Sequence, residues 1–138
     1  MSSSGDAIDF GNLFEKVRSN GSCSNQTRAA CFGGLDDPSL HAEIQYITIA
    51  STGDSKDFGD LTSARNDHRG ACASPVRGLV FGGITPSITS AIDMITIPTL
   101  GDAADFGDLQ GARERGMGCS NSVRGLSAGG QDPAATSN

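Results

Sequence analysis

Apolar residues along this chain come in short runs that are typical of β-strands. Two runs, IQYITI at Ile44–Ile49 and IDMITI at Ile92–Ile97, are rich in β-branched residues and partly alternate with polar ones, as half-buried strands do. A third run, RGLVF at Arg77–Phe81, ends at a Gly-Gly pair. No stretch between them has the periodicity of an amphipathic helix. The pattern therefore predicts an all-β chain of short antiparallel strands.

The same pattern returns every 48 residues. One tripeptide occurs three times, as Asp9-Phe10-Gly11, Asp57-Phe58-Gly59 and Asp105-Phe106-Gly107. A Gly-Asp pair stands four residues before each copy, as Gly5-Asp6, Gly53-Asp54 and Gly101-Asp102. Fixed periods of this size are typical of solenoids and propellers.

Each unit continues with a Cys, an Arg five residues later and a closing glycine pair. These positions are Cys23, Cys72 and Cys119; Arg28, Arg77 and Arg124; and Gly33-Gly34, Gly82-Gly83 and Gly129-Gly130. The IxxITI run, the DFG segment, the Cys segment and the run before the glycine pair make four predicted strands in each unit. Four strands in about 50 residues are typical of a propeller blade, and kelch blades have that length. Paired glycines allow positive φ and a close backbone approach where a strand turns.

Two segments resemble a known repeat almost residue for residue: IQYITIASTGDSKDFGDLTSAR (44–65) and ACASPVRGLVFGG (71–83). The repeat recurs in predicted structural proteins of tailed bacteriophages, especially marine and cyanobacterial ones. The resemblance covers about residues 5–131. It implies a kelch-like β-propeller in a virion-associated protein, made in the host cytoplasm, without enzyme activity or cofactor.

The repeat predicts a single domain, residues 1–138, with units at about 5–34 (incomplete), 35–83 and 84–131 and a tail at 132–138. The first unit lacks an IxxITI run, so we expect about three blades and eleven strands. Closed propellers have about four to eight blades, and an open arc exposes strand edges. We therefore expect oligomerisation to complete the ring, as a head-to-tail homodimer of six blades, or packing against another virion protein.

Charge and composition exclude several classes of function. The net charge is −6 and the pI about 4.6, so no basic face is expected for nucleic acid or an anionic membrane. No run approaches the roughly 20 apolar residues of a membrane span. The start, MSSSGDAIDF, lacks the pattern of a secretion signal. Without such a signal, we expect all four cysteines to be small buried residues.

The repeated carboxylates allow two interpretations. Asp54, Asp57 and Asp60 are spaced three residues apart, and clustered carboxylates on a loop can bind calcium. Aspartates beside glycine also cap turns through the backbone, and we favour that role. Magnesium binding of the kinase type is excluded, because the tripeptide is repeated and no GxGxxG loop accompanies it.

The other repeated residues have predicted roles in packing. We expect the phenylalanines of the DFG copies to fill the space between blades. The repeated arginines, Arg28, Arg77 and Arg124, are expected to pair with repeated aspartates between blades and set their register. His41 and His68 lie at non-equivalent places, and no Ser-His-Asp or Cys-His arrangement is apparent. No catalytic or metal-binding residue is predicted.

The sequence thus predicts a non-enzymatic structural or adhesive protein of a phage particle, on a tail fibre, baseplate or capsid surface. It would be a scaffold for assembly or host recognition, with variable loops at 35–42, 65–70 and 84–91 carrying recognition. The alternative is a carbohydrate-binding propeller lectin for a cell-surface glycan. Sugar sites usually need an aromatic platform, and aromatic residues are only 5% of this chain, which weighs against the lectin.

Overall fold

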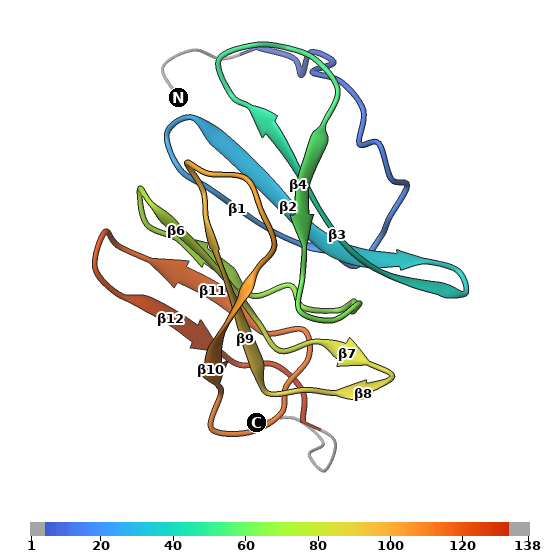
Figure 1. The fold of residues 1–138 in the computed structure, drawn as a ribbon, viewed down its shortest axis with the longest axis vertical. Coiled ribbons are helices and arrows are strands. Elements are labelled where there is room, and N and C mark those ends of the chain that lie inside the picture. Colours follow the sequence, from blue (N-terminus) through green and yellow to red (C-terminus); the bar gives the residue numbers. More distant parts are fainter. Residues whose placement is uncertain (1–4, 133–138) are drawn as a thin grey trace.

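The computed structural model describes residues 5–132 (Figure 1). Every regular element in this range is a β-strand, so the predicted all-β fold is confirmed. Among the described residues there is no helix with the length and apolarity needed to cross a membrane. The predicted tail at 132–138 lies, except for Asp132, outside the described residues.

Two four-stranded antiparallel sheets form the body of the molecule. The first has the order β1-β2-β3-β4, with β1 at Gly21–Ser24, β2 at Arg28–Asp36, β3 at Ser39–Thr48 and β4 at Lys56–Asp60. The second has the order β10-β9-β6-β5, with β5 at Ala71–Ala73, β6 at Arg77–Phe81, β9 at Ala91–Thr96 and β10 at Ala104–Asp108. β4 and β10, which carry the second and third DFG copies, are therefore equivalent edge strands.

Two hairpins complete the fold. β7 (Ile84–Thr85) and β8 (Ser87–Ile88) form a small one between β6 and β9, and β11 (Met117–Ser120) pairs with β12 (Gly125–Ala128). The β11–β12 hairpin is equivalent to β1–β2 and β5–β6, but in residues 5–132 no third strand joins it. Each four-stranded sheet takes strands from two consecutive sequence units, and no sheet closes on itself within the described range.

The first DFG copy is not a strand. Residues 5–17 contain no strand, although the sequence pattern predicts one at Asp9–Gly11. In the other two copies the DFG strand pairs with the IxxITI strand that precedes it, β3 or β9. Residues 5–17 have no such run before them in the described range, so the segment instead lies against the loop at Gly53–Ser55.

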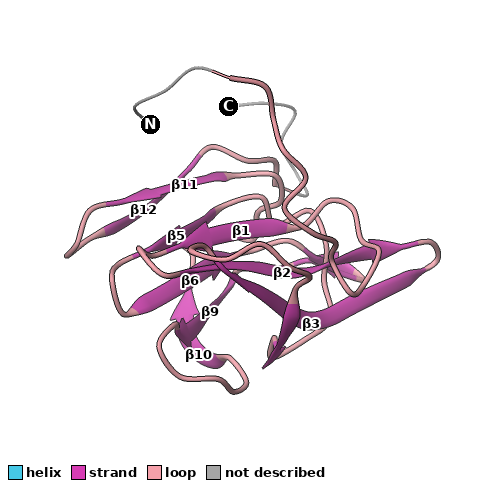
Figure 2. Ribbon diagram, turned by 90° about the horizontal axis from the view of Figure 1, so that it is seen from above, coloured by secondary structure: helices cyan, strands magenta, loops and turns pink. Residues whose placement is uncertain are grey.

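The core lies between the sheets. Its buried members are Ala30, Phe32, Ile44, Phe58, Leu61, Ala71, Val80, Ile95 and Ile97. The first strands of the three equivalent hairpins pack together, since β5 contacts both β1 and β11; Figure 2 shows β11 and β12 layered over β5. The IxxITI runs therefore supply core residues, as their pattern predicts.

The cysteines follow this layering. A Cβ on Gly78 would lie 2.8 Å from Cys23 Sγ, and one on Gly125 would lie 2.7 Å from Cys72 Sγ, so each of these cysteines is covered by the glycine of the next hairpin. Burial raises the pKa of Cys23 to about 12. Cys72 is buried, Cys23 and Cys31 are partly buried, and Cys119 is exposed. The prediction of four buried cysteines is confirmed for Cys72, holds only in part for Cys23 and Cys31, and is wrong for Cys119, because no described hairpin covers it.

Candidate functional site

The aspartate of each DFG copy caps its own turn. In all three copies a carboxylate oxygen accepts a hydrogen bond from the glycine N–H two residues on, at 3.1 Å (Asp9–Gly11), 3.0 Å (Asp57–Gly59) and 2.9 Å (Asp105–Gly107). This is the Asx-turn geometry favoured by Asp. The turn-capping prediction is confirmed.

The DFG glycine allows the backbone of the next repeat to come close. Gly59 has φ +137°, which favours glycine. A Cβ there would lie 2.5 Å from the carbonyl carbon of Gly101. The register between β3 and β4 shifts here, so that Phe58 forms a bulge. The bulge turns the edge of β4 toward the Gly101 loop.

That loop binds β4 through three hydrogen bonds. Gly101 N–H donates to Phe58 O at 2.8 Å, and Ala103 N–H donates to Asp60 O at 2.7 Å. Asp60 N–H donates in return to a carboxylate oxygen of Asp102 at 3.0 Å. The segment that begins at the Gly-Asp pair of one repeat is thus hydrogen-bonded to the DFG segment of the repeat before it. We call this arrangement the DFG junction.

A second DFG junction lies one repeat earlier. Gly53 N–H donates to Phe10 O and Ser55 N–H to Asn12 O, both at 2.8 Å. Asn12 N–H donates to a carboxylate oxygen of Asp54, also at 2.8 Å. A Cβ on Gly11 would lie 2.3 Å from Gly53 O. The two junctions therefore share the same donors and acceptors, 48 residues apart.

The third DFG copy has no such partner in residues 5–132. A Cβ on Gly107 would meet nothing within 4 Å. Phe106 is 51% exposed, whereas Phe58 is 3% exposed and meets Tyr46 edge to face, with ring centroids 5.9 Å apart. The DFG phenylalanines were predicted to fill the space between repeats. Phe58 is buried, whereas the prediction is wrong for Phe106, because no following repeat within residues 5–132 covers it.

The repeated arginines do not pair with the repeated aspartates. Arg28 Nη1 donates to the carbonyls of Ile97 and Pro98, at 2.8 and 3.1 Å, and the guanidinium lies 5.0 Å from the centre of the Tyr46 ring. Among the described residues no ion pair includes Arg28, Arg77 or Arg124. The predicted ion pairing is wrong; Arg28 instead holds the main chain that leads into the Gly-Asp pair.

The glycine pairs have the predicted conformation. All six residues, Gly33, Gly34, Gly82, Gly83, Gly129 and Gly130, have positive φ. Gly34 N–H donates to Arg65 O at 3.0 Å, and Gly83 N–H donates to Arg113 O at 2.9 Å. A Cβ on Gly82 would lie 2.2 Å from Arg113 O. The loop after each DFG segment therefore crosses directly over the preceding glycine pair.

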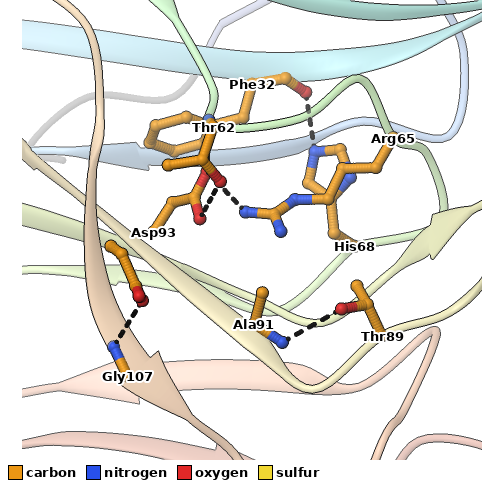
Figure 3. A network of polar contacts seen from close by, with 9 residues as sticks. Phe32, Thr62, Arg65, His68, Thr89, Ala91, Asp93 and Gly107 are labelled. Atoms are coloured by element: carbon orange, nitrogen blue, oxygen red, sulfur yellow. Dashed lines mark hydrogen bonds and ion pairs between the residues drawn. The ribbon is translucent and has the colours of Figure 1, made fainter.

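The loop at 65–70 is part of the core. Arg65 and Asp93 are 0% and 1% exposed, and Arg65 Nη2 lies 2.8 Å from an Asp93 oxygen. Thr62 also donates to Asp93, through its N–H and its hydroxyl (Figure 3). The loop cannot serve as an exposed recognition surface, so that prediction is wrong.

His68 in this loop is held neutral. Its Nε2–H donates to Phe32 O at 2.8 Å (Figure 3), and its side chain is fully buried. Burial lowers the pKa of His68 to about 4, helped by the nearby positive charge of Arg65. An imidazole in this state is a packing and hydrogen-bonding group at neutral pH.

A further ladder links the repeats at positions that the sequence analysis missed. Asp67 N–H donates to Ser19 O at 2.8 Å, and Arg115 N–H donates to Asp67 O at 2.7 Å. All three residues have positive φ although none is glycine. They lie 48 residues apart but differ in side chain, so only their spacing could have revealed them. The Arg115 guanidinium also donates to an Asp67 oxygen at 2.9 Å.

The other two predicted loops are hairpin tips. Residues 35–42 span the end of β2, the turn at 37–38 and the start of β3, and residues 84–91 contain the β7–β8 hairpin. Both tips project on the same side in Figure 1. Their residues are exposed or partly buried, so they are available for contacts.

A cavity of about 500 Å³ lies near the open DFG copy. It is lined by the β5–β6 turn, the β11–β12 turn and the Phe106 side chain, with Arg77 and Asn121 among its polar residues. Within residues 5–132, no three His, Cys, Asp or Glu side chains converge in a way that could hold a metal ion. The carboxylates of the DFG junctions act instead as acceptors for main-chain N–H groups.

In comparisons with known proteins, no family model matches the chain and no curated protein matches it. Its functional interpretation therefore depends on its own residues and geometry.

Proposed function

We propose that this chain is a non-enzymatic structural or adhesive protein of a phage particle, on a tail fibre, baseplate or capsid surface. In this proposal its repeats are kelch-like propeller blades that serve as a scaffold for assembly or host recognition. The observation that carries the proposal is the DFG junction. The residues that recur in sequence there are used to fasten one repeat to the next through main-chain hydrogen bonds, as in repeat scaffolds.

The polar groups of the core support a non-catalytic role. The Arg65–Asp93 pair and His68 are buried between the sheets, where a substrate has no access. Thr62 and Phe32 O provide hydrogen-bond partners for Asp93 and His68. Such fully enclosed pairs act in specifying how sheets pack rather than in chemistry at a surface.

The attachment to a phage particle comes from the resemblance of residues 44–65 and 71–83 to repeats of phage structural proteins. The hairpin tips at 35–42 and 84–91 are then the parts that contact a host surface or another virion protein, since loops on a rigid scaffold usually carry binding. The virion would be the final location of the chain.

Mass spectrometry of purified phage particles tests this proposal. The chain is expected in intact particles that have been treated with protease and washed in high salt, at a constant number of copies per particle. An antibody against the 84–91 hairpin should label the particle surface in electron micrographs. Detection of the chain only in lysate, and never in particles, would refute the proposal.

One observation favours a second candidate function, a carbohydrate-binding lectin. The cavity beside β10 combines a half-exposed aromatic ring, Phe106, with the polar side chains of Arg77 and Asn121, and sugars bind aromatic faces flanked by hydrogen-bonding groups. A glycan array would test it. Binding that is lost in Phe106→Ser and kept in Phe14→Ser would support the lectin, and an array without binding would exclude it for the glycans displayed.

A further inference from the structure

Each DFG segment that is followed by a repeat binds that repeat's Gly-Asp pair. The main-chain N–H of Asp60 donates to the Asp102 carboxylate, and the N–H of Asn12 donates to the Asp54 carboxylate in the same register. The third segment, at Phe106–Asp108 on the edge strand β10, offers the same turn and the same bulge. Nothing in residues 5–132 lies within 4 Å of the position of a Cβ on Gly107. The DFG side of a third junction, which offers its two main-chain carbonyls and which we call the acceptor half, is therefore present and has no partner in residues 5–132.

The donor half of such a junction is also present, at the other end of the described chain. Gly5 and Asp6 correspond to Gly53-Asp54 and Gly101-Asp102. Both residues are exposed, and a Cβ on Gly5 would meet nothing within 4 Å. In residues 5–132 Asp6 makes no hydrogen bond or ion pair. Residues 5–132 thus carry one unused half of each kind.

We propose that the Gly5-Asp6 pair of one copy of this chain clasps the Phe106–Asp108 segment of a second copy. The equivalent atoms define the register of the contact. Gly5 N–H would donate to Phe106 O, and Ala7 N–H to Asp108 O. Asp108 N–H would donate to the Asp6 carboxylate. The inference builds on the repeat scaffold of the proposed function and names its partner, a second copy bound head to tail.

Two other contacts between repeats extend the same match. Arg115 is the last member of the ladder that begins at Ser19, so its carbonyl would accept from Ser19 N–H of the second copy. Arg77 is the equivalent of Arg28, but its side chain has no hydrogen bond or ion pair in residues 5–132. It lines the 500 Å³ cavity together with Phe106, so it lies on the surface that the second copy would cover.

Exposed apolar side chains mark the same end of the molecule. Phe106, Val123 and Leu126 are 51%, 86% and 61% exposed, and the first two line the cavity. Exposed apolar groups gathered at an interaction surface are typical of sites covered by a partner. A second copy fits this surface specifically, because the chain itself contains the Gly-Asp sequence that occupies both equivalent sites.

The contact joins two different surfaces, so it is heterologous. Repeated contacts of this type close into a ring when the rotation between copies permits, and otherwise extend into a filament. In either case each copy contributes one Gly5-Asp6 donor and one Phe106–Asp108 acceptor. A variant that lacks either half should therefore fail to associate with itself, but it should still bind a variant that lacks the other half.

Sedimentation equilibrium of matched variants tests the inference. The wild-type chain should associate to masses above the 14.1 kDa of one copy. Asp6→Ala should weaken association by about tenfold or more, because a hydrogen bond to a charged group is lost, and leave the melting temperature of the monomer unchanged. Asp102→Ala, the matched control, removes the equivalent bond inside the chain and should lower that melting temperature by roughly 5 °C.

Arg77→Glu, on the acceptor surface, should also prevent association while preserving the fold. A mixture of Asp6→Ala and Arg77→Glu chains should form one-to-one pairs, since one intact donor and one intact acceptor remain. A wild-type chain that stays monomeric at concentrations up to about 100 μM would overturn the inference. So would association that neither substitution weakens. Both outcomes are independent of whether the chain occurs in phage particles, so the inference and the proposed function can fail separately.

Discussion

The DFG segment of β4 and the DFG segment of β10 have the same sequence and the same turn, yet their surroundings are opposite. Phe58 in β4 is 3% exposed and Phe106 in β10 is 51% exposed. Gly59 lies against the main chain of Gly101, whereas a Cβ on Gly107 would meet nothing within 4 Å among residues 5–132. Both glycines have nearly the same φ, +137° and +135°. The local conformation is therefore a property of the tripeptide, while burial is a property of the next repeat.

This comparison shows what each repeat contributes to its neighbour. A unit forms its own turn, bulge and edge strand. The outer edge of that strand lacks hydrogen-bond partners unless the Gly-Asp pair of the next repeat binds there. The stability of the first sheet thus depends on residues that lie about 40 positions later, such as Asp102 for Asp60. Substitutions at equivalent positions should have unequal effects. Two of the four experiments below measure that inequality directly, and the other two measure the stability of the buried region behind the closed segment.

The largest effect is expected at the buried ion pair of Arg65 and Asp93. Asp93→Ala leaves Arg65 charged and buried, which should cost about 3–5 kcal/mol in the free energy of unfolding. The equivalent positions one repeat earlier are Val17 and Gln45, a neutral pair. The double variant Arg65→Val with Asp93→Gln should therefore recover a large part of the loss. Urea denaturation of the single and double variants measures this; equal losses would show that the charge pair has no special cost.

Removing the phenylalanine ring should lower the free energy of unfolding more in the closed segment, at Phe58, than in the open segment, at Phe106. Phe58→Ala empties a buried site against Tyr46 and should cost about 3–4 kcal/mol. Phe106→Ala should cost less than half as much in the monomer, because the ring is half exposed. Thermal unfolding at concentrations where the chain is monomeric measures both. Similar losses for the two variants would contradict the difference in burial.

Acid should weaken the closed region through His68. Its folded-state pKa of about 4 lies below the ordinary value of 6.5, so the unfolded chain takes up a proton first. The contribution is complete above pH 6.5 and falls as the pH drops toward 4, by roughly 3 kcal/mol. His68→Asn should remove this part of the pH dependence. Urea midpoints from pH 7 to 4 measure it, and parallel profiles for the two proteins would refute it.

The smallest difference is expected between the two DFG glycines. Gly59→Ala and Gly107→Ala place a side chain at nearly the same positive φ, which costs about 1–3 kcal/mol in either case. Only at position 59 does the new Cβ also overlap the Gly101 main chain, which should add about 1–3 kcal/mol. At concentrations where the chain is monomeric, the difference between the two melting temperatures isolates the close approach of the repeats. It should vanish if the junction opens in solution.

Much of the local structure was predictable from the sequence. The aspartates at 9, 57 and 105 cap their turns, and the glycine pairs have positive φ, because both features depend on a few neighbouring residues. The predicted Arg–Asp pairs and the exposed loop at 65–70 were wrong, since both depend on which segments meet across the sheets. The Ser19, Asp67 and Arg115 ladder was missed because its repeated bonds join main-chain groups of three different residue types, so no side chain recurs to mark these positions.

The sequence by itself determined that the chain is all-β, that it repeats every 48 residues and that each DFG copy forms the same capped turn. Those properties come from β-branched runs, glycines and aspartates acting over short distances. Only the tertiary structure decided which copy is buried. A Gly-Asp pair covers the first two copies and leaves Phe106 and Gly107 open. The physical reason is that hydrogen bonds between repeats need a second segment in register, and a repeated tripeptide does not specify where that segment lies.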